Sequence, residues 1–139
     1  MSPARPDNDR AGNKKRGALY EAAFNYYAQR TGAEVFLSQG DHSVVDAVVI
    51  SEMGKLYRVQ IKGTTQTKVV GVKITKGKPG KILKDTEYDV LAVYAQAYDA
   101  WYLIPSNMVN TRKTLKVFPM FPDSQGQYEV YREHWKIFK

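Results

Sequence analysis

An apolar segment that contains a single carboxylate places the strongest constraint on how this chain folds. Residues 44–50 read Val-Val-Asp-Ala-Val-Val-Ile, and an alternating segment, Leu-Tyr-Arg-Val-Gln-Ile-Lys, follows at residues 56–62. Runs of β-branched residues that are apolar at nearly every position are typical of a strand covered on both faces. The sequence therefore predicts neighbouring strands at 44–51 and 55–62, with Asp46 as an acidic side chain inside the first.

The residues that join these two strands predict a tight hairpin. A loop of Glu52, Met53 and Gly54 would pair Ser51 with Lys55. Loops of this length require a left-handed residue, and glycine adopts that conformation without a steric penalty. The loop therefore predicts the register of the whole hairpin.

In that register, three polar side chains meet on one face. Asp46 lies opposite Gln60, and Lys62 shares the face because alternate side chains of a strand point the same way. Val59 and Ile61 point into a core. Burial of a carboxylate and an ammonium costs free energy unless something compensates. An ion pair between Asp46 and Lys62 would compensate, and so would a divalent cation held by oxygen ligands from Asp46 and Gln60. The spacing leaves both possibilities open.

The rest of the chain indicates one domain. Apolar residues at helical spacing predict a helix at 16–31, ended by Gly32, with Glu21 at the edge of its apolar arc. Further strands are predicted at 33–38, 66–75, 88–95 and 101–104, with an extended segment at 115–121, a short helix from Ser106 or Asn107 and a closing helix at 128–138. Residues 1–15 are expected to be a disordered basic arm. The predicted fold is a single α/β (α+β) domain at 16–139 with an N-terminal helix, a central mixed sheet and a C-terminal helix.

The positive charge of the chain is concentrated in two segments. The net charge is +7, and residues 62–84 contain seven lysines and no acidic residue. The first sixteen residues add five basic residues against two acidic ones. A localised basic stretch is typical of a protein that binds a polyanion, and nucleic acid is the first candidate. A membrane surface is not expected, because these lysines alternate with Val and Ile as in a strand. A solvated hairpin and a loose tail remain the alternative.

Several classes of protein are excluded by what the sequence lacks. There is no cysteine, which excludes disulfides, thiolate metal clusters and a cysteine nucleophile. No apolar run approaches the ~18 residues of a membrane span, and the polar N-terminus does not read as a secretory signal. Neither a phosphate-binding Gly-Lys-Ser/Thr loop nor a zinc spacing occurs. The cytoplasm of a bacterial or phage-infected cell is the simplest location.

The order and spacing of four residues resemble the PD-(D/E)XK nuclease superfamily. These are Glu21 on the predicted helix, Asp46 on one strand and Gln60-x-Lys62 on the next. Two positions depart from the family pattern, since Val45 replaces the proline and Gln60 replaces the usual acid. The glutamine form is similar to bacterial and phage intron homing endonucleases, whereas archaeal Holliday junction resolvases share the framework with the acid form.

The resemblance implies a restriction-endonuclease-like fold and metal-assisted hydrolysis of phosphodiester bonds. Asp46, the Gln60 carbonyl and Glu21 would hold Mg²⁺, for which Mn²⁺ would substitute, and Lys62 would stabilise developing negative charge or orient the nucleophile. DNA phosphates would be neutralised by Lys68, Lys73, Lys76, Lys78, Lys81 and Lys84, on a β-ribbon at 66–84 that fits a major groove.

Three residues near this pattern are further candidates for contact with the scissile phosphate. His42 and Ser43 precede the Asp46 strand, and Gln66 follows Lys62. A polar turn at 41–43 and an ordinary strand start at Gln66 are the simpler interpretations.

Three functions agree with this pattern. The first is a Mg²⁺-dependent, site-specific DNA endonuclease of the homing type, and the second is a structure-specific nuclease such as a Holliday junction resolvase. The third is a non-catalytic DNA-binding protein on a degenerate nuclease fold, since Gln60 removes one charge from the site. The expected partner is double-stranded or branched DNA. A chain this short has little recognition surface, so a homodimer or homotetramer is expected to extend it by symmetry.

Overall fold

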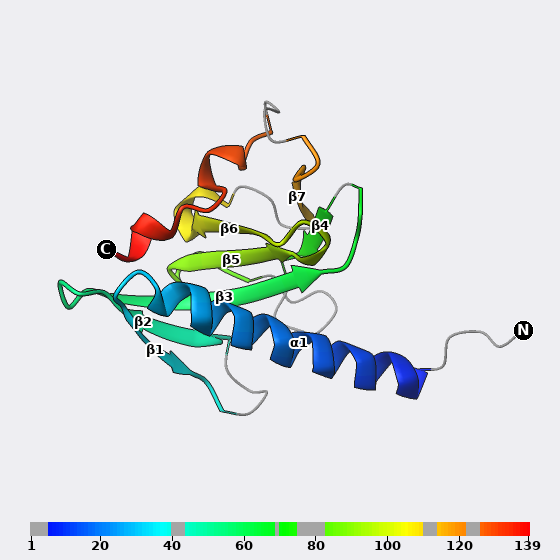
Figure 1. The fold of residues 1–139 in the computed structure, drawn as a ribbon, viewed down its shortest axis with the longest axis horizontal. Helices are drawn as coiled ribbons and strands as arrows, with labels where there is room; N and C mark the ends of the chain where they lie inside the picture. Colours follow the sequence, from blue (N-terminus) through cyan, green and yellow to red (C-terminus); the bar gives the residue numbers. More distant parts are fainter. Residues whose placement is uncertain (1–5, 40–43, 69, 75–82, 110–113, 122–125) are drawn as a thin grey trace, which may run out of the picture.

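The structure is a computed structural model that describes residues 6–39, 44–68, 70–74, 83–109, 114–121 and 126–139. Within these residues, one five-stranded sheet has the order β1-β2-β3-β5-β6, and a separate two-stranded sheet pairs β4 with β7 (Figure 1). The larger sheet contains β1 (Glu34–Leu37), β2 (Ala47–Ile50), β3 (Leu56–Thr64), β5 (Val90–Ala95) and β6 (Ala100–Pro105). The smaller sheet contains β4 (Val70–Lys73) and β7 (Thr114–Val117). Because β3 and β5 run parallel while the other pairs are antiparallel, the sheet is mixed, as the sequence predicts.

The larger sheet is covered on both faces, and each face has its own apolar core. Helix α1 (Pro6–Gln29) crosses one face, which we call the α1 face, and buries Tyr20, Phe24 and Ala28 against it. The β4–β7 sheet covers the opposite face, which we call the β4–β7 face. Side chains of β5 alternate between the two cores and are all buried, so β5 is the interior strand that its apolar sequence predicts. No helix among the described residues combines the length and hydropathy that a membrane crossing requires.

Helix α1 begins ten residues earlier than its apolar spacing predicts. It starts at Pro6, so residues 6–15, which we expected to be disordered, are helical, and residues 1–5 lie outside the described part. Proline is favoured at the first position of a helix, and Asp7 and Asp9 follow it where acidic residues suit the helix dipole. These start signals are present in the sequence, although few apolar residues accompany them. The extra turns carry basic residues beyond the sheet (Figure 1).

The closing α-helix predicted at 128–138 is wrong. The segment forms two short 3₁₀ helices, η3 (Glu129–Tyr131) and η4 (Trp135–Phe138), separated by Glu133 in a left-handed conformation with φ 52°. The backbone N–H of Glu133 donates to the Trp101 carbonyl at 2.7 Å, and its carboxylate accepts from the Trp101 N–H at 2.6 Å. Pairing with β6 therefore replaces continued helix, because the sheet edge offers hydrogen bonds that local spacing does not reveal.

Replacing Glu133 with alanine is expected to destabilise the fold by about 1–3 kcal/mol, because the buried Trp101 N–H loses its acceptor. The same carboxylate also accepts the Trp135 indole N–H at 3.0 Å. Urea unfolding measures the effect, and Glu133→Gln, which keeps one acceptor oxygen, serves as the milder control. Equal unfolding midpoints for Glu133→Ala and the unchanged protein would contradict this assignment.

The hairpin between β2 and β3 has the predicted register. Ala47 pairs with Val59, and the ladder ends at the loop, where the Ser51 N–H donates to the Lys55 carbonyl at 2.9 Å. Gly54 has φ 84°, the left-handed conformation that the loop was expected to need. The loop thus fixes which residues of the two strands face each other near Asp46.

Candidate active site

Followed from the hairpin loop, the β2–β3 ladder ends at the pair of Ala47 and Val59, next to Asp46. Beyond this pair, the side-chain carboxylate of Asp46 takes the place of a backbone carbonyl as the acceptor of the next hydrogen bond from β3. The Asp46 N–H donates to the carbonyl of Val59, which is already the ladder partner of Ala47, at 2.9 Å. One carboxylate oxygen, Oδ2, then accepts the backbone N–H of Ile61 at 2.7 Å. The Asp46 carbonyl accepts from Ser38 at the end of β1 at 2.8 Å. Asp46 is therefore held by the backbone of both neighbouring strands.

This arrangement differs from simple cross-strand pairing of Asp46 with Gln60. The Asp46 carboxylate binds the backbone of Ile61, which lies between Gln60 and Lys62 in the sequence, and its charge interacts with that of Lys62. A departure from the ladder of this kind re-aims a side chain at the end of a strand. The interaction of Asp46 with Lys62 thus accompanies a local geometry that differs from simple pairing, and the convergence of Gln60 with them stays a prediction.

Gln60 and Lys62 share one face of β3, as predicted. Val59 and Ile61 belong to the core under α1, so Gln60 and Lys62 face the opposite side, the β4–β7 face. In the parallel ladder with β5, Lys62 pairs with Val93, whose side chain belongs to the core of that face. Gln60 and Lys62 are both half-buried.

Burial disfavours the charged forms of both Asp46 and Lys62. Desolvation raises the pKa of Asp46 above its usual 3.8, and the Ile61 hydrogen bond and the Lys62 charge reduce that rise. Desolvation likewise lowers the pKa of Lys62 below 10.5, and the Asp46 charge opposes the shift. In each group burial outweighs the attraction between them. The ion pair alone therefore does not compensate for burial, and a further cation beside Asp46 would favour its ionised form.

Glu21 follows Tyr20 on α1, which covers the α1 face, whereas Gln60 and Lys62 face the opposite side of the sheet. Its neighbour Tyr20 packs directly on Gly63, where a Cβ atom would come within 2.4 Å of the Tyr20 ring. Glu21 itself is half-buried on α1. Within the described ranges, no three His, Cys, Asp or Glu side chains are grouped as a metal site, so a cation held at Asp46 would take further oxygen ligands, for which the Gln60 amide oxygen is a candidate.

Gly63→Ala is expected to destabilise the protein by about 1–3 kcal/mol, because the new methyl group overlaps the Tyr20 ring. The cost should shrink in a Tyr20→Leu background, which makes room for the methyl group. Thermal or urea unfolding of the two single variants and the double variant measures this coupling. A cost that stays the same in both backgrounds would show that Tyr20 does not set the spacing between α1 and β3.

The remaining predicted site residues divide into three groups. Gln66 is exposed, and its side-chain oxygen accepts the Gly71 N–H at 2.8 Å, so it holds the loop before β4. The lysines at 68, 73 and 84, which are predicted to bind DNA, are exposed. The predictions for His42, Ser43, Lys76, Lys78 and Lys81 lie outside the described residues.

The β-ribbon predicted at 66–84 falls partly on residues 75–82, which lie outside the described residues, but its first strand has a partner that was not predicted. All four residues of β4 pair with β7, about forty residues further along the chain. The sequence pattern identifies β4 as a strand, but it contains no local signal for its distant partner.

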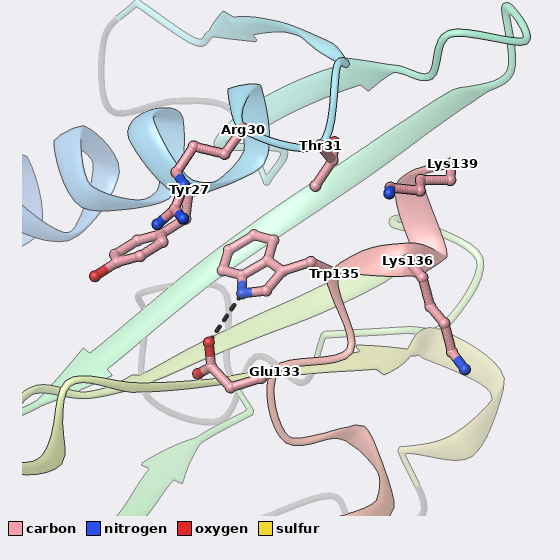
Figure 2. A pocket seen from close by; sticks show the side chains of 7 residues that line it. All are labelled: Tyr27, Arg30, Thr31, Glu133, Trp135, Lys136 and Lys139. Carbon is pink, nitrogen blue, oxygen red and sulfur yellow. Dashed lines mark hydrogen bonds between the residues drawn. The ribbon is translucent and has the colours of Figure 1, made fainter.

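Two surface hollows differ in the residues that line them. One of about 370 Å³ lies at the C-terminal end of α1, where Trp135 stacks against Tyr27 and its indole N–H donates to Glu133 (Figure 2). These contacts hold the C-terminal segment, and none of the predicted site residues lines this hollow. The other, about 380 Å³, is lined by Phe36, Leu37, Ser38, Val45, Ala47, Val48 and Arg58. Neither of these two hollows is lined by Glu21, Asp46, Gln60 or Lys62, so the site is assigned from side-chain positions and not from a pocket.

Comparisons with known proteins agree with this fold. No curated protein matches the chain significantly. A solved structure of a bacterial homing endonuclease, I-Ssp6803I, aligns over 89% of this chain and 90% of its own, with a TM-score of 0.71 and 21% sequence identity. The Holliday junction resolvase Hjc from Archaeoglobus fulgidus aligns over 83% of this chain and 88% of its own, with a TM-score of 0.55 and 13% identity. Both share the restriction-endonuclease-like fold that the sequence predicts.

The family assignment comes from the sequence itself. A model of the PD-(D/E)XK endonuclease family matches residues 11–137, which include Glu21, Asp46, Gln60 and Lys62. The matched span runs from the N-terminal half of α1 to η4, so it contains the whole mixed sheet. The chain belongs to the PD-(D/E)XK endonuclease family.

Proposed function

We propose that this protein is a Mg²⁺-dependent, site-specific DNA endonuclease of the homing type, with its active site at Asp46, Gln60, Lys62 and Glu21. The observation that carries the proposal is the Asp46 carboxylate fixed on the Ile61 N–H, between Gln60 and Lys62. Burial disfavours both charges in this half-buried site, and the attraction between Asp46 and Lys62 offsets that cost only in part. In a site that binds a cation and a phosphate, the negative charge of Asp46 would attract the cation and the positive charge of Lys62 would attract the phosphate.

The donor set fits a hard divalent cation. A carboxylate has acceptor capacity beyond the Ile61 hydrogen bond, and the Gln60 amide adds a neutral oxygen. Asp46, Gln60 and Glu21 would hold Mg²⁺, and Mn²⁺ would substitute for it. When bound, the cation would polarise the scissile phosphate and lower the pKa of the attacking water.

The chain's own residues would orient and neutralise the substrate. The Lys62 ammonium, two residues from the Asp46 anchor on β3, would stabilise the negative charge that develops on the phosphate oxygens. The half-buried position of Lys62 strengthens that interaction relative to an exposed lysine. The exposed lysines at 68, 73 and 84 would contribute to DNA affinity in a salt-dependent way.

The homing-type activity is favoured over the resolvase activity by two observations. Gln60 occupies the position where the glutamine form of the family pattern occurs. The fold is also more similar to the homing endonuclease, with a TM-score of 0.71, than to the resolvase, with 0.55. We further propose that a homodimer or homotetramer forms in the cytoplasm and extends recognition along the duplex.

The test is to incubate the protein with plasmid, random linear duplex and four-way junction DNA, each with Mg²⁺ and each with EDTA. Discrete plasmid fragments that require Mg²⁺ are the expected result. Symmetric nicks in the junction alone would replace the proposal with a resolvase. Binding without cleavage in either Mg²⁺ or Mn²⁺ would leave a non-catalytic DNA-binding protein.

A further inference from the structure

The two-stranded β4–β7 sheet has one buried face and one exposed face. Val72 and Leu115 pair across the strands and are buried against the larger sheet. The alternating positions carry Gly71 opposite Lys116 and Lys73 opposite Thr114. Lys73, Thr114 and Lys116 are exposed, so the outward face of this ribbon consists of two lysines, a threonine and a glycine.

The ribbon is anchored to the strand that carries Lys62. The Gln66 side chain accepts the Gly71 N–H at 2.8 Å, and the Gln66 N–H donates to the Thr64 hydroxyl at 3.1 Å, at the end of β3. The Tyr98 hydroxyl donates to the Thr67 carbonyl in the same loop. Since Lys62 lies two residues before Thr64, the ribbon keeps a fixed position relative to the proposed active site (Figure 1).

The charge of the ribbon suits a polyanion. Lys68 is exposed in the loop before β4, close in sequence to the outward Lys73. The described residues 63–68, 70–74 and 114–121 contain no Asp or Glu that would neutralise these lysines. On β7, Lys116 contributes a charge that lies outside the lysine-rich segment at 62–84 and comes next to Lys73 only through the fold.

We propose that the outward face of the β4–β7 ribbon enters the major groove of duplex DNA and reads base pairs beside the bond to be cut. The inference rests on the proposed function in taking duplex DNA as the partner. A major groove about 12 Å wide admits a two-stranded β-ribbon. Lysine donates to guanine O6 and N7, and threonine offers a hydroxyl and a methyl group to base edges. Lys73, Thr114 and Lys116 are the specificity-determining residues.

Gly71 and the rigid anchoring favour base contacts over phosphate contacts alone. A Cβ atom at Gly71 would lie 2.9 Å from the Thr114 methyl group, so any other residue at this position would displace the Thr114 side chain. Because glycine has no side chain, the backbone opposite Lys116 is left uncovered. Backbone without a side chain permits a close approach to the groove. A phosphate contact needs only a flexible charged side chain, whereas base reading needs elements held in a fixed register.

The experiment selects bound sequences from duplexes with a randomised centre, in EDTA, so that cleavage plays no part. The unchanged protein is expected to enrich a defined sequence. Lys116→Ala should reduce discrimination at one base position by about tenfold or more, with the other positions preserved. Lys136→Ala removes a matched charge from η4, which packs on the α1 face, and should leave the preference unchanged.

Two results would overturn the inference. A uniform loss of affinity in Lys116→Ala with an unaltered sequence preference would make the ribbon a phosphate contact only. The absence of any enriched sequence with the unchanged protein would exclude base reading. Thr114→Val, which keeps the side-chain shape but loses the hydroxyl, gives a second test in a variant expected to fold normally, and circular dichroism verifies folding of each.

Failure of the base-reading inference and failure of the proposed nuclease function would give different results. A protein that enriches a sequence in EDTA but does not cut a plasmid carrying that sequence in Mg²⁺ supports the recognition ribbon and contradicts the nuclease proposal. A protein that cuts DNA in Mg²⁺ at no preferred sequence keeps the nuclease activity but contradicts base reading and the site-specific part of the proposed function.

Discussion

Lys62→Met is expected to lower the rate of Mg²⁺-dependent DNA cleavage by about 10²- to 10³-fold. Lys62 is half-buried two residues beyond Gln60, on the same face of β3, and its charge interacts with Asp46. Methionine fills a similar volume without the charge, so the variant tests the ammonium itself. Single-turnover cleavage of plasmid DNA measures the effect, because it separates chemistry from product release.

The control for this variant is Lys136→Met, which removes an exposed lysine from η4 and should cut at the normal rate. Binding of both variants to DNA in EDTA should stay within a few-fold of the unchanged protein, since one phosphate contact is a small part of the total. Normal cleavage by Lys62→Met would remove Lys62 from the site. Equal losses in both variants would indicate an effect of net charge alone.

The double variant Asp46→Asn/Lys62→Met is expected to be more stable than the unchanged protein, by about 1–4 kcal/mol near neutral pH. Burial disfavours the charge on both side chains, so removing both charges relieves that cost. Asparagine keeps an oxygen that accepts the Ile61 N–H, so the hydrogen bond at the start of β2 survives. Urea unfolding compares the double variant with each single variant.

The gain in stability should depend on pH in a defined direction. The raised pKa of Asp46 means that its ionisation costs stability as pH rises through the folded-state value, with no cost below 3.8. The lowered pKa of Lys62 means that its protonation costs stability as pH falls through the folded-state value, with no cost above 10.5. The double variant should therefore gain most between the two folded-state pKa values.

The single variants provide the contrast. Each leaves one buried charge without its partner, so each should be less stable than the double variant. A double variant less stable than the unchanged protein would show that the pair is a net stabilising contact, which would support a structural ion pair over an active site. This result would count against the proposed function even before any cleavage is measured.

The sequence predicts those parts of the fold that short-range interactions determine. The loop that ends in Gly54 sets the β2–β3 register. Alternation along β3 places Gln60 and Lys62 on one face and the core residues Val59 and Ile61 on the other. The position of the Asp46 carboxylate was predictable only in outline. A strand period of two does not reveal that the ladder stops at Ala47 and that a side chain binds the Ile61 N–H instead.

The wrong predictions mainly concern contacts between distant parts of the chain. β4 pairs with β7, which brings Lys116 beside Lys73, and no local pattern encodes that partner. The C-terminal segment has helical spacing, yet hydrogen bonds between Glu133 and Trp101 divide it into two short 3₁₀ helices. The apolar pattern also misses the first ten residues of α1, whose start signals are proline and acidic residues. Tertiary contacts decide the first two cases, and weak amphipathicity explains the third.

Cleavage of supercoiled plasmid by the unchanged protein and by Asp46→Asn, side by side in Mg²⁺ and in EDTA, tests the active-site assignment most directly. Asparagine preserves the shape and the Ile61 hydrogen bond but lacks the charge that would hold the cation. The account predicts cleavage by the unchanged protein in Mg²⁺ alone, with Asp46→Asn folded, bound to DNA and inactive. Equal cleavage by both proteins, or cleavage that persists in EDTA, would contradict it.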